Sequence, residues 1–339
     1  MYFSHLMLCD RREGLSSQTR YEQLFEEVRL LEELGYWCCW FAEHHFAGYA
    51  LMPDCLLMAA AAARETSRIR LGAGVVVLPF QHHPIRVAEQ AAMVDCLSHG
   101  RLELGFGRGY QPHEFSGFGI TLEEGQERFD QALHVVVKAL EQLDGFTYDT
   151  PLFKGEHITI WPTPVQRPIP CWGAAISEAS FLRYGQMGWP ILTFPANQSP
   201  ELLKAQIDTY RRVYREHGHD PSLMRIGLTM FTYVAEDADD AHATFERGMA
   251  HYFGFLHRIT TDAEVVQHDV YESLPTTARL SGSPAQVVQR LREVVGYFDV
   301  TDIVNVTQFR GYLTHEQVLG SIRLFAERVM PAFRPVAAS

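Results

Sequence analysis

The stretch Ile69-Arg70-Leu71-Gly72-Ala73-Gly74-Val75-Val76-Val77-Leu78-Pro79 is almost wholly apolar and ends at a proline. Strands that are buried on both faces of a parallel sheet have this near-continuous apolar composition. Gly72 and Gly74 interrupt the run, and a glycine inside a strand usually marks the close approach of another group. The stretch therefore predicts a central strand of a parallel sheet, against which either a flat ligand or a tight barrel interior packs.

Similar strands alternate with helical patterns along the rest of the chain. We expect eight strands, at residues 2–8, 37–41, 69–79, 102–106, 171–175, 191–194, 225–234 and 302–306. Helix starts are marked by Ser283-Pro284-Ala285-Gln286 and by Thr314 with Gln317, both of which have the capping-box pattern. Eight alternating units favour an α/β fold of the closed (β/α)₈ type, the TIM barrel, over an open doubly wound sheet.

The length of 339 residues suits one such barrel with additions. We expect a single domain over residues 1–334, with insertions at about 144–170 and 237–282, which follow the fourth and seventh strands, and a flexible tail at 335–339. The irregular stretch at about 250–282, with Gly254, Gly282, Tyr252 and Tyr271, is predicted to form a lid.

Composition excludes several classes of function. The formal net charge of -12 and the scattered lysines and arginines argue against a nucleic-acid partner and against binding to an anionic membrane. No signal peptide or membrane-length apolar segment is visible, and the six cysteines show no CxxC spacing, so we expect free thiols in a cytoplasmic protein.

Two histidines follow the second expected strand, in Glu43-His44-His45-Phe46. The C-terminal ends of barrel strands are where such proteins place their chemistry, and histidine exchanges protons near neutral pH. Structural histidines and a metal site shared with His82-His83 are the alternatives. Neither pair has the spacing of common metal motifs, and adjacent residues on a strand point to opposite faces, so only one of each pair can face a cavity.

Other strand ends carry groups that suit an anion. Gly105-Phe106-Gly107-Arg108-Gly109-Tyr110 lacks dinucleotide-fingerprint spacing, so Arg108 is either a phosphate ligand or a surface residue. The hydroxyls of Ser177 and Ser180, with backbone N–H groups at a helix N-terminus, form either an anion site or an ordinary helix cap. Arg128 either reaches the same anion or faces solvent. Five aromatic residues are candidates for an apolar cavity wall or for simple core: Phe46, Tyr110, Phe115, Trp189 and Phe194.

These blocks together resemble the bacterial luciferase-like flavin-dependent monooxygenases over nearly the whole chain. The resemblance is carried by Glu43–Phe46, Gly72–Pro79 with His83–Arg86, Ser98–Gly109, Ala175–Ser180 and Arg323–Pro331. It implies a barrel that binds reduced FMN, supplied by a separate flavin reductase, and that uses O₂ through a C4a-peroxyflavin to oxygenate an organic, apolar or biosynthetic-intermediate substrate. An F420-dependent oxidoreductase or a non-catalytic flavin-binding homologue on the same barrel is the alternative, and a metal-dependent barrel hydrolase is a minor one.

The resemblance also assigns residues. His44 matches the catalytic base, and Gly74-Val75 matches a non-proline cis peptide under the isoalloxazine ring. The positions that match the family's phosphate ligands are Arg108, Arg128, Ile176, Ser177 and Ser180. No metal is implied. Family members often form homodimers through the helices after the second and third strands, and the Met58–Ala63 face would suit either that contact or packing on the chain's own sheet.

Overall fold

Eight parallel strands close into a barrel in the computed structural model of the chain, which describes residues 1–48, 50–261 and 275–333. The strands are β1 (Tyr2–Met7), β2 (Cys38–Phe41), β3 (Arg70–Val77), β4 (Leu102–Gly107), β7 (Cys171–Ala174), β8 (Ile191–Thr193), β9 (Ile226–Val234) and β11 (Asp302–Val306). Closure comes from β1, which pairs with β2 on one side and β11 on the other, and from the pairing of β8 with β9. The TIM barrel is thus confirmed, and the open doubly wound sheet is excluded.

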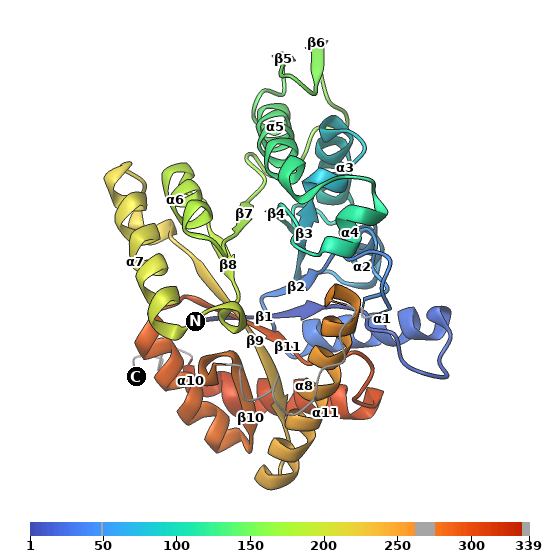
Figure 1. Ribbon diagram of the computed structural model, residues 1–339, viewed down its shortest axis with the longest axis vertical. Helices are drawn as coiled ribbons and strands as arrows, with labels where there is room; N and C mark the ends of the chain where they lie inside the picture. The colour runs from blue at the N-terminus through green and yellow to red at the C-terminus, as the bar shows by residue number, and fades with distance from the viewer. Residues whose placement is uncertain (49, 262–274, 334–339) are drawn as a thin grey trace.

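Helices surround the barrel on all sides (Figure 1). They are α1 (Ser17–Glu33), α2 (Cys55–Glu65), α3 (Pro84–Leu97), α4 (Pro112–Gly117), α5 (Leu122–Glu141), α6 (Glu178–Met187), α7 (Pro200–Glu216), α8 (Ala238–Thr261), α10 (Pro284–Phe298) and α11 (His315–Leu324). The capping boxes expected at Ser283 and Thr314 are present, and each satisfies backbone N–H groups that the first helical turn leaves unpaired.

The first insertion forms a two-stranded antiparallel hairpin, β5 (Phe146–Asp149) and β6 (Lys154–Ile158), which projects from the barrel at the top of Figure 1. The second insertion is more regular than we expected. Residues 250–261 continue α8, and β10 (Arg279–Gly282) pairs with the end of β9 as a ninth strand beside the barrel. Tyr271 and the tail at 335–339 lie outside the described residues, so the predicted lid is in part untested.

Two apolar clusters pack the barrel. The large one fills the space between strands and helices, and a small one consists of Cys38, Trp40, Trp172 and Val304. These four residues come from β2, β7 and β11, which are not neighbours in the sheet, so their side chains meet inside the barrel. Along β2 the residues alternate between the two clusters, as the pleat requires.

The N-terminal end of the barrel interior is closed by ion pairs and rings. Glu103 pairs with Arg70 and accepts a hydrogen bond from Trp172 Nε1 at 2.5 Å. Arg225 pairs with Asp302, and its guanidinium lies 3.7 Å from the centre of the Trp37 ring. Because this end is filled, open space in the barrel can lie only toward the C-terminal ends of the strands.

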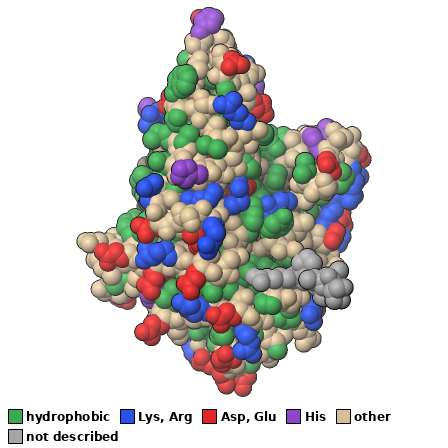
Figure 2. All heavy atoms as spheres, turned by 180° about the vertical axis from the view of Figure 1, so that it is seen from behind, with side chains coloured by type: hydrophobic (Ala, Val, Ile, Leu, Met, Phe, Trp, Pro, Cys, Tyr) green, Lys and Arg blue, Asp and Glu red, His purple; other side chains and the backbone are tan. Residues whose placement is uncertain are grey.

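The expected absences can be checked over the described ranges. There, no helix is long and apolar enough to cross a membrane. All six cysteines are free, as predicted. On the face seen in Figure 2, both acidic and basic side chains are spread over the surface.

Gly105 tests the close packing of β3 on β4. A Cβ atom there would lie 2.3 Å from the backbone oxygen of Ala73, so Gly105→Ala should lower the free energy of unfolding by about 2 kcal/mol or more. Gly296 in α10 has open space around it, and Gly296→Ala should instead raise that free energy by up to about 1 kcal/mol. Urea unfolding followed by circular dichroism measures both, and a Gly105→Ala protein as stable as the parent would contradict this packing.

Candidate active site

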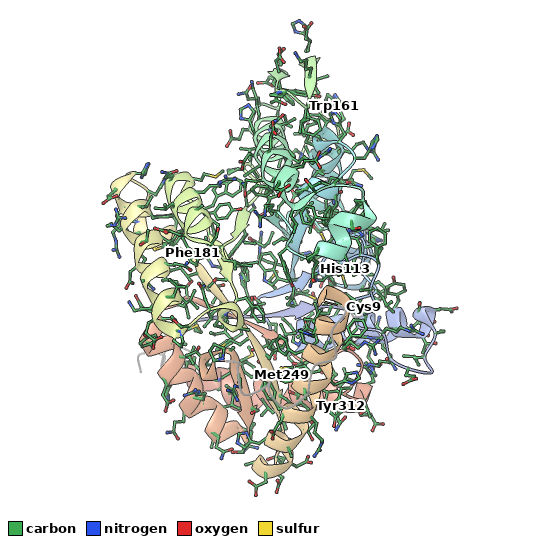
Figure 3. The ribbon with its side chains drawn as sticks, viewed as in Figure 1. Cys9, His113, Trp161, Phe181, Met249 and Tyr312 are labelled. Carbon is green, nitrogen blue, oxygen red and sulfur yellow. The ribbon has the colours of Figure 1, made fainter. Side chains whose placement is uncertain are left out.

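A cavity of about 620 Å³ opens at the C-terminal ends of the barrel strands. Every barrel strand lines it with at least one residue, among them Leu6, Trp40, Gly74, Gly107, Ala174, Leu192, Thr229 and Val304. His113 of α4 and Phe181 of α6, labelled in Figure 3, mark the two helices on opposite sides of the opening. The site therefore lies where barrel proteins carry out their chemistry.

His44 is the histidine of the pair that lines the cavity. Its Nδ1 lies 3.0 Å from Oε1 of Glu114 in α4, and the same oxygen accepts the backbone N–H of His45 at 2.9 Å. Burial acts to raise the pKa of Glu114, but the hydrogen bonds from His44 and His45 outweigh it and hold that pKa below its ordinary value. A carboxylate only accepts hydrogen bonds, so Nδ1 carries a proton in this contact, and the tautomer that it selects has Nε2 as its acceptor nitrogen.

Glu114 was not among the residues predicted from the sequence. Pro112, which starts α4, was a usable signal, because it places Glu114 in the first turn of a helix that begins beside the strand ends. The His44–Glu114 pair has the arrangement of a base and the group that orients it, with the base at a cavity wall.

His45 has a different environment. Its Nε2 lies 3.4 Å from Oε1 of Glu43, and its ring packs on Phe118 with 4.8 Å between ring centres. His45 is not among the residues that line the cavity. The expectation that one histidine of the pair faces the cavity is confirmed, and His45 contributes to packing.

Glu43 joins the ends of β2 and β3. It accepts hydrogen bonds from Gln81 Nε2 at 2.9 Å and from the backbone N–H of Val77 at 3.3 Å, and Cys55 Sγ lies 3.6 Å from it. Burial, only partly offset by the hydrogen bond from His45, raises the pKa of Glu43 to about 7. No group of three metal-ligating side chains occurs among the described residues, so a metal site at these histidines gains no support.

The wall formed by β3 and β4 is smooth because it is built from glycine. The Gly74–Val75 peptide bond is cis, as predicted, and both residues line the cavity. A Cβ on Gly107 would lie 2.4 Å from Val75 Cγ2, so only glycine leaves room for that side chain. Gly74, Gly107 and Gly109 line this wall together with the side chains of Val75 and Val77.

The N-terminus of α6 lines the cavity at the end away from His44 and Glu114. Ser177 caps the helix, and Ser180 Oγ accepts the backbone N–H groups of Ile176 and Ser177, both at 3.0 Å. The capping role is therefore real. All three residues also line the cavity, together with Arg108, so the structure gathers these predicted anion ligands.

Arg128 is placed differently from the other predicted ligands. It pairs with Glu124 at 3.8 Å and is not among the residues lining the cavity in the described chain. Arg183 lines the cavity instead and was not predicted. Its spacing was informative, because it lies one helical turn after Ser180 and thus on the same face of α6.

The aromatic wall also differs from expectation. Tyr110 and Phe194 line the cavity as predicted, whereas Phe46, Phe115 and Trp189 do not. Phe46 is 64% exposed, and Phe115 is buried in the core. The sequence analysis did not predict the aromatic cavity residues Phe129, Tyr184 and Phe231, because they lie in apolar patterns that are typical of core. Tyr252, which was predicted to belong to a lid, also lines the cavity from α8.

Comparisons with known proteins agree with this site. The family model described as luciferase-like monooxygenase matches residues 1–299, and the chain therefore belongs to the luciferase-like monooxygenase family. The oxygenase component of the flavin-dependent trigonelline monooxygenase of Acinetobacter baylyi is 27% identical over 357 residues, covering 98% of this chain and 96% of that protein.

Solved structures show the same fold. Monooxygenase RslO1 from Streptomyces bottropensis superposes with a TM-score of 0.88 at 26% identity, covering 98% of this chain and 100% of that one. An F420-dependent secondary alcohol dehydrogenase in complex with an F420–acetone adduct has a TM-score of 0.77 at 16% identity, over 98% of this chain and 99% of that chain. The second likeness is one of fold alone.

The pKa of Glu43 predicts a pH-dependent stability. Its folded-state pKa of about 7 exceeds the ordinary value of 4.5, so its contribution is complete below pH 4.5 and is lost as the pH rises to about 7. The shift corresponds to about 3 kcal/mol. Gln does not titrate, so the free energy of unfolding of Glu43→Gln should rise relative to that of the parent as the pH increases over this range. Urea unfolding of both proteins at several pH values measures the difference, and a difference independent of pH would refute the assignment.

Proposed function

We propose that this protein is the oxygenase of a two-component flavin-dependent monooxygenase that uses reduced FMN and O₂ on an organic, apolar substrate. The observation that carries the proposal is that one cavity joins a glycine-rich wall, the donors Arg108, Ser177 and Ser180, and the His44–Glu114 pair. The naming of a relative as an oxygenase component supports a separate flavin reductase as partner.

The residues present fit FMN at both of its ends. Arg108 supplies a charged donor for a phosphate. The hydroxyls of Ser177 and Ser180 and the N–H of Ile176, which bond to one another and to the backbone within the cap of α6, would turn to the phosphate as neutral donors. Arg128, which pairs with Glu124, belongs to this proposal as an outer phosphate ligand. The wall at Gly74 and Val75 offers room for a planar ring. When bound, the reduced flavin supplies the electrons that activate O₂.

His44 is proposed to move a proton at the reacting end. Glu114 holds its Nδ1–H, so that Nε2 exchanges the proton, as in other base–carboxylate pairs. The remaining walls are apolar and aromatic, with Leu8, Phe194, Phe231 and Val306 among them. Such walls exclude water from the reaction and favour an apolar substrate.

The fold shared with an F420-dependent dehydrogenase keeps hydride transfer as the second candidate. F420 also carries a phosphate, so Arg108 and the serines would serve either cofactor. The two candidates differ in the group that is bound and in the need for O₂, and a non-catalytic flavin-binding protein would show binding without oxygen chemistry.

His44→Ala tests the proposal. Anaerobic titrations of the parent protein with reduced FMN and with reduced F420 should show tight binding of FMN, and the variant should bind FMN equally well. On mixing with O₂, stopped-flow absorbance should show flavin reoxidation altered by about a hundredfold in the variant, the usual weight of a proton-transfer group. His134→Ala, at an exposed position of α5, is the matched control and should behave as the parent.

Failure to bind reduced FMN would overturn the proposal, and binding of F420 alone would replace it with hydride transfer. Parent-like reoxidation in His44→Ala would remove His44 from the chemistry.

We also propose a homodimer formed by α2 and α3. Leu57, Met93 and Leu97 are exposed on these helices, at 69%, 51% and 40%, whereas Ala59, Ala62 and Ala63 are buried within the chain. The alanine face thus packs on the protein's own core, and larger side chains form the surface contact. Light scattering should give twice the chain mass for the parent and a monomer for Leu57→Glu/Met93→Glu; a monomeric parent or a dimeric variant would contradict the interface.

A further inference from the structure

A continuous chain of polar contacts crosses the anion-binding end of the cavity. Arg108 Nη1 donates to Gln126 Oε1 at 3.5 Å, and Gln126 Nε2 donates to Asp130 Oδ1 at 3.0 Å. The same Asp130 oxygen pairs with Arg183 Nη1. All four side chains line the cavity, so the guanidiniums from β4 and α6 are linked through a single carboxylate on α5.

Helix geometry explains which residues of α5 take part. Gln126 and Asp130 are four positions apart and thus lie one above the other on one face. Phe129, on the same side, lines the cavity and packs under Arg183, whose Cζ lies 5.4 Å from the ring centre. Arg128 projects from another face, where it meets Glu124.

The charges at this end do not balance. Three acidic side chains line the cavity in the described chain, namely Glu43, Glu114 and Asp130. Glu43 and Glu114 are bound to His45 and His44 at the other end. Asp130 is therefore the one lining carboxylate at this end: it pairs with Arg183 directly and is linked to Arg108 through Gln126, so that two guanidiniums share one carboxylate among the described lining residues.

We propose that Arg183 is a phosphate-binding residue of this protein, and that Asp130 occupies its guanidinium until an anionic group arrives at the N-terminus of α6. This inference rests on the proposed function, in which the phosphate is that of FMN. It adds two residues with opposite effects on the binding of that phosphate: Arg183 favours it and Asp130 opposes it. Arg183 and Asp130 are partly exposed, with 31% and 43% of their side chains accessible, so the exchange of partners needs no rearrangement of the core.

The exchange has a consequence for affinity. Binding of a phosphate gains a charge-assisted contact to Arg183 but loses the contact between Arg183 and Asp130, and it brings the phosphate near a like charge. Asp130 therefore lowers the affinity for the phosphate and speeds its release. Moderate affinity and fast release are suited to a reduced flavin that is delivered by a separate reductase and dissociates after each turnover, rather than to a permanently bound cofactor.

FMN and riboflavin differ only in the phosphate group, so the ratio of their dissociation constants measures the contribution of the phosphate to binding. Dissociation constants of both flavins are measured by fluorescence quenching for the parent, Arg183→Gln and Asp130→Asn. In Arg183→Gln the preference for FMN over riboflavin should fall about tenfold, the weight of one charge-assisted hydrogen bond. In Asp130→Asn that preference should rise several-fold, with the change mainly in the dissociation rate of FMN. Riboflavin affinity should stay constant in both.

Arg212→Gln and Glu216→Gln are the matched controls, because they remove the same charges from an exposed ion pair on α7. Both should leave the preference unchanged, which excludes a general effect of net charge. A parent protein without any preference for FMN would refute the phosphate site of the proposed function. If the parent prefers FMN, this inference alone would be overturned by an Arg183→Gln variant that keeps the full preference, or by an Asp130→Asn variant whose preference is weaker than that of the parent.

Discussion

The packing of Trp40 against the glycines of β3 is the contact on which the cavity depends. A Cβ on Gly72 would lie 2.1 Å from Trp40 Cε3, so only glycine lets the indole lie flat on that strand. Trp40 in turn meets the edge of Trp172, with 5.3 Å between ring centres, and the two rings fill the middle of the barrel. Gly74 and Gly107 line the cavity above these rings and add no side chain to it. A packed barrel thereby holds a cavity at one end without loss of its core.

The cavity is polarised along its length. His44 and the Glu114 carboxylate lie at the end formed by β2 and α4, where the Glu114 carboxylate accepts the His44 Nδ1–H. Guanidiniums, serine hydroxyls and the N-terminus of α6 lie at the end formed by β4 and β7. Between them run the glycine wall and the aromatic side chains. A molecule with one anionic end and one planar end is therefore oriented by the cavity before any chemistry occurs.

The pKa values of two buried carboxyl groups near the histidines are shifted in opposite directions. Burial dominates at Glu43 and raises its pKa to about 7, although His45 and the Val77 amide oppose it. Burial also acts on Glu114, but His44 and the His45 amide outweigh it and keep Glu114 ionised. The difference makes Glu114 a permanent acceptor for His44 and leaves Glu43 as a structural link between strand ends that titrates near neutral pH.

The sequence alone determined the barrel, its eight strands, the two insertions and the cis bond at Gly74–Val75, because these follow from apolar runs, caps and a block pattern with fixed spacing. It also predicted that His44, Arg108, Ser177 and Ser180, which lie at or shortly after strand ends, share one site, and all four line the cavity. Only the tertiary structure brought in Glu114, Asp130 and Arg183 and left Arg128 outside the cavity wall. These side chains project from helices, and a helix's rotation about its own axis, which decides which of its polar residues face the cavity, is set by packing between elements that are distant in sequence.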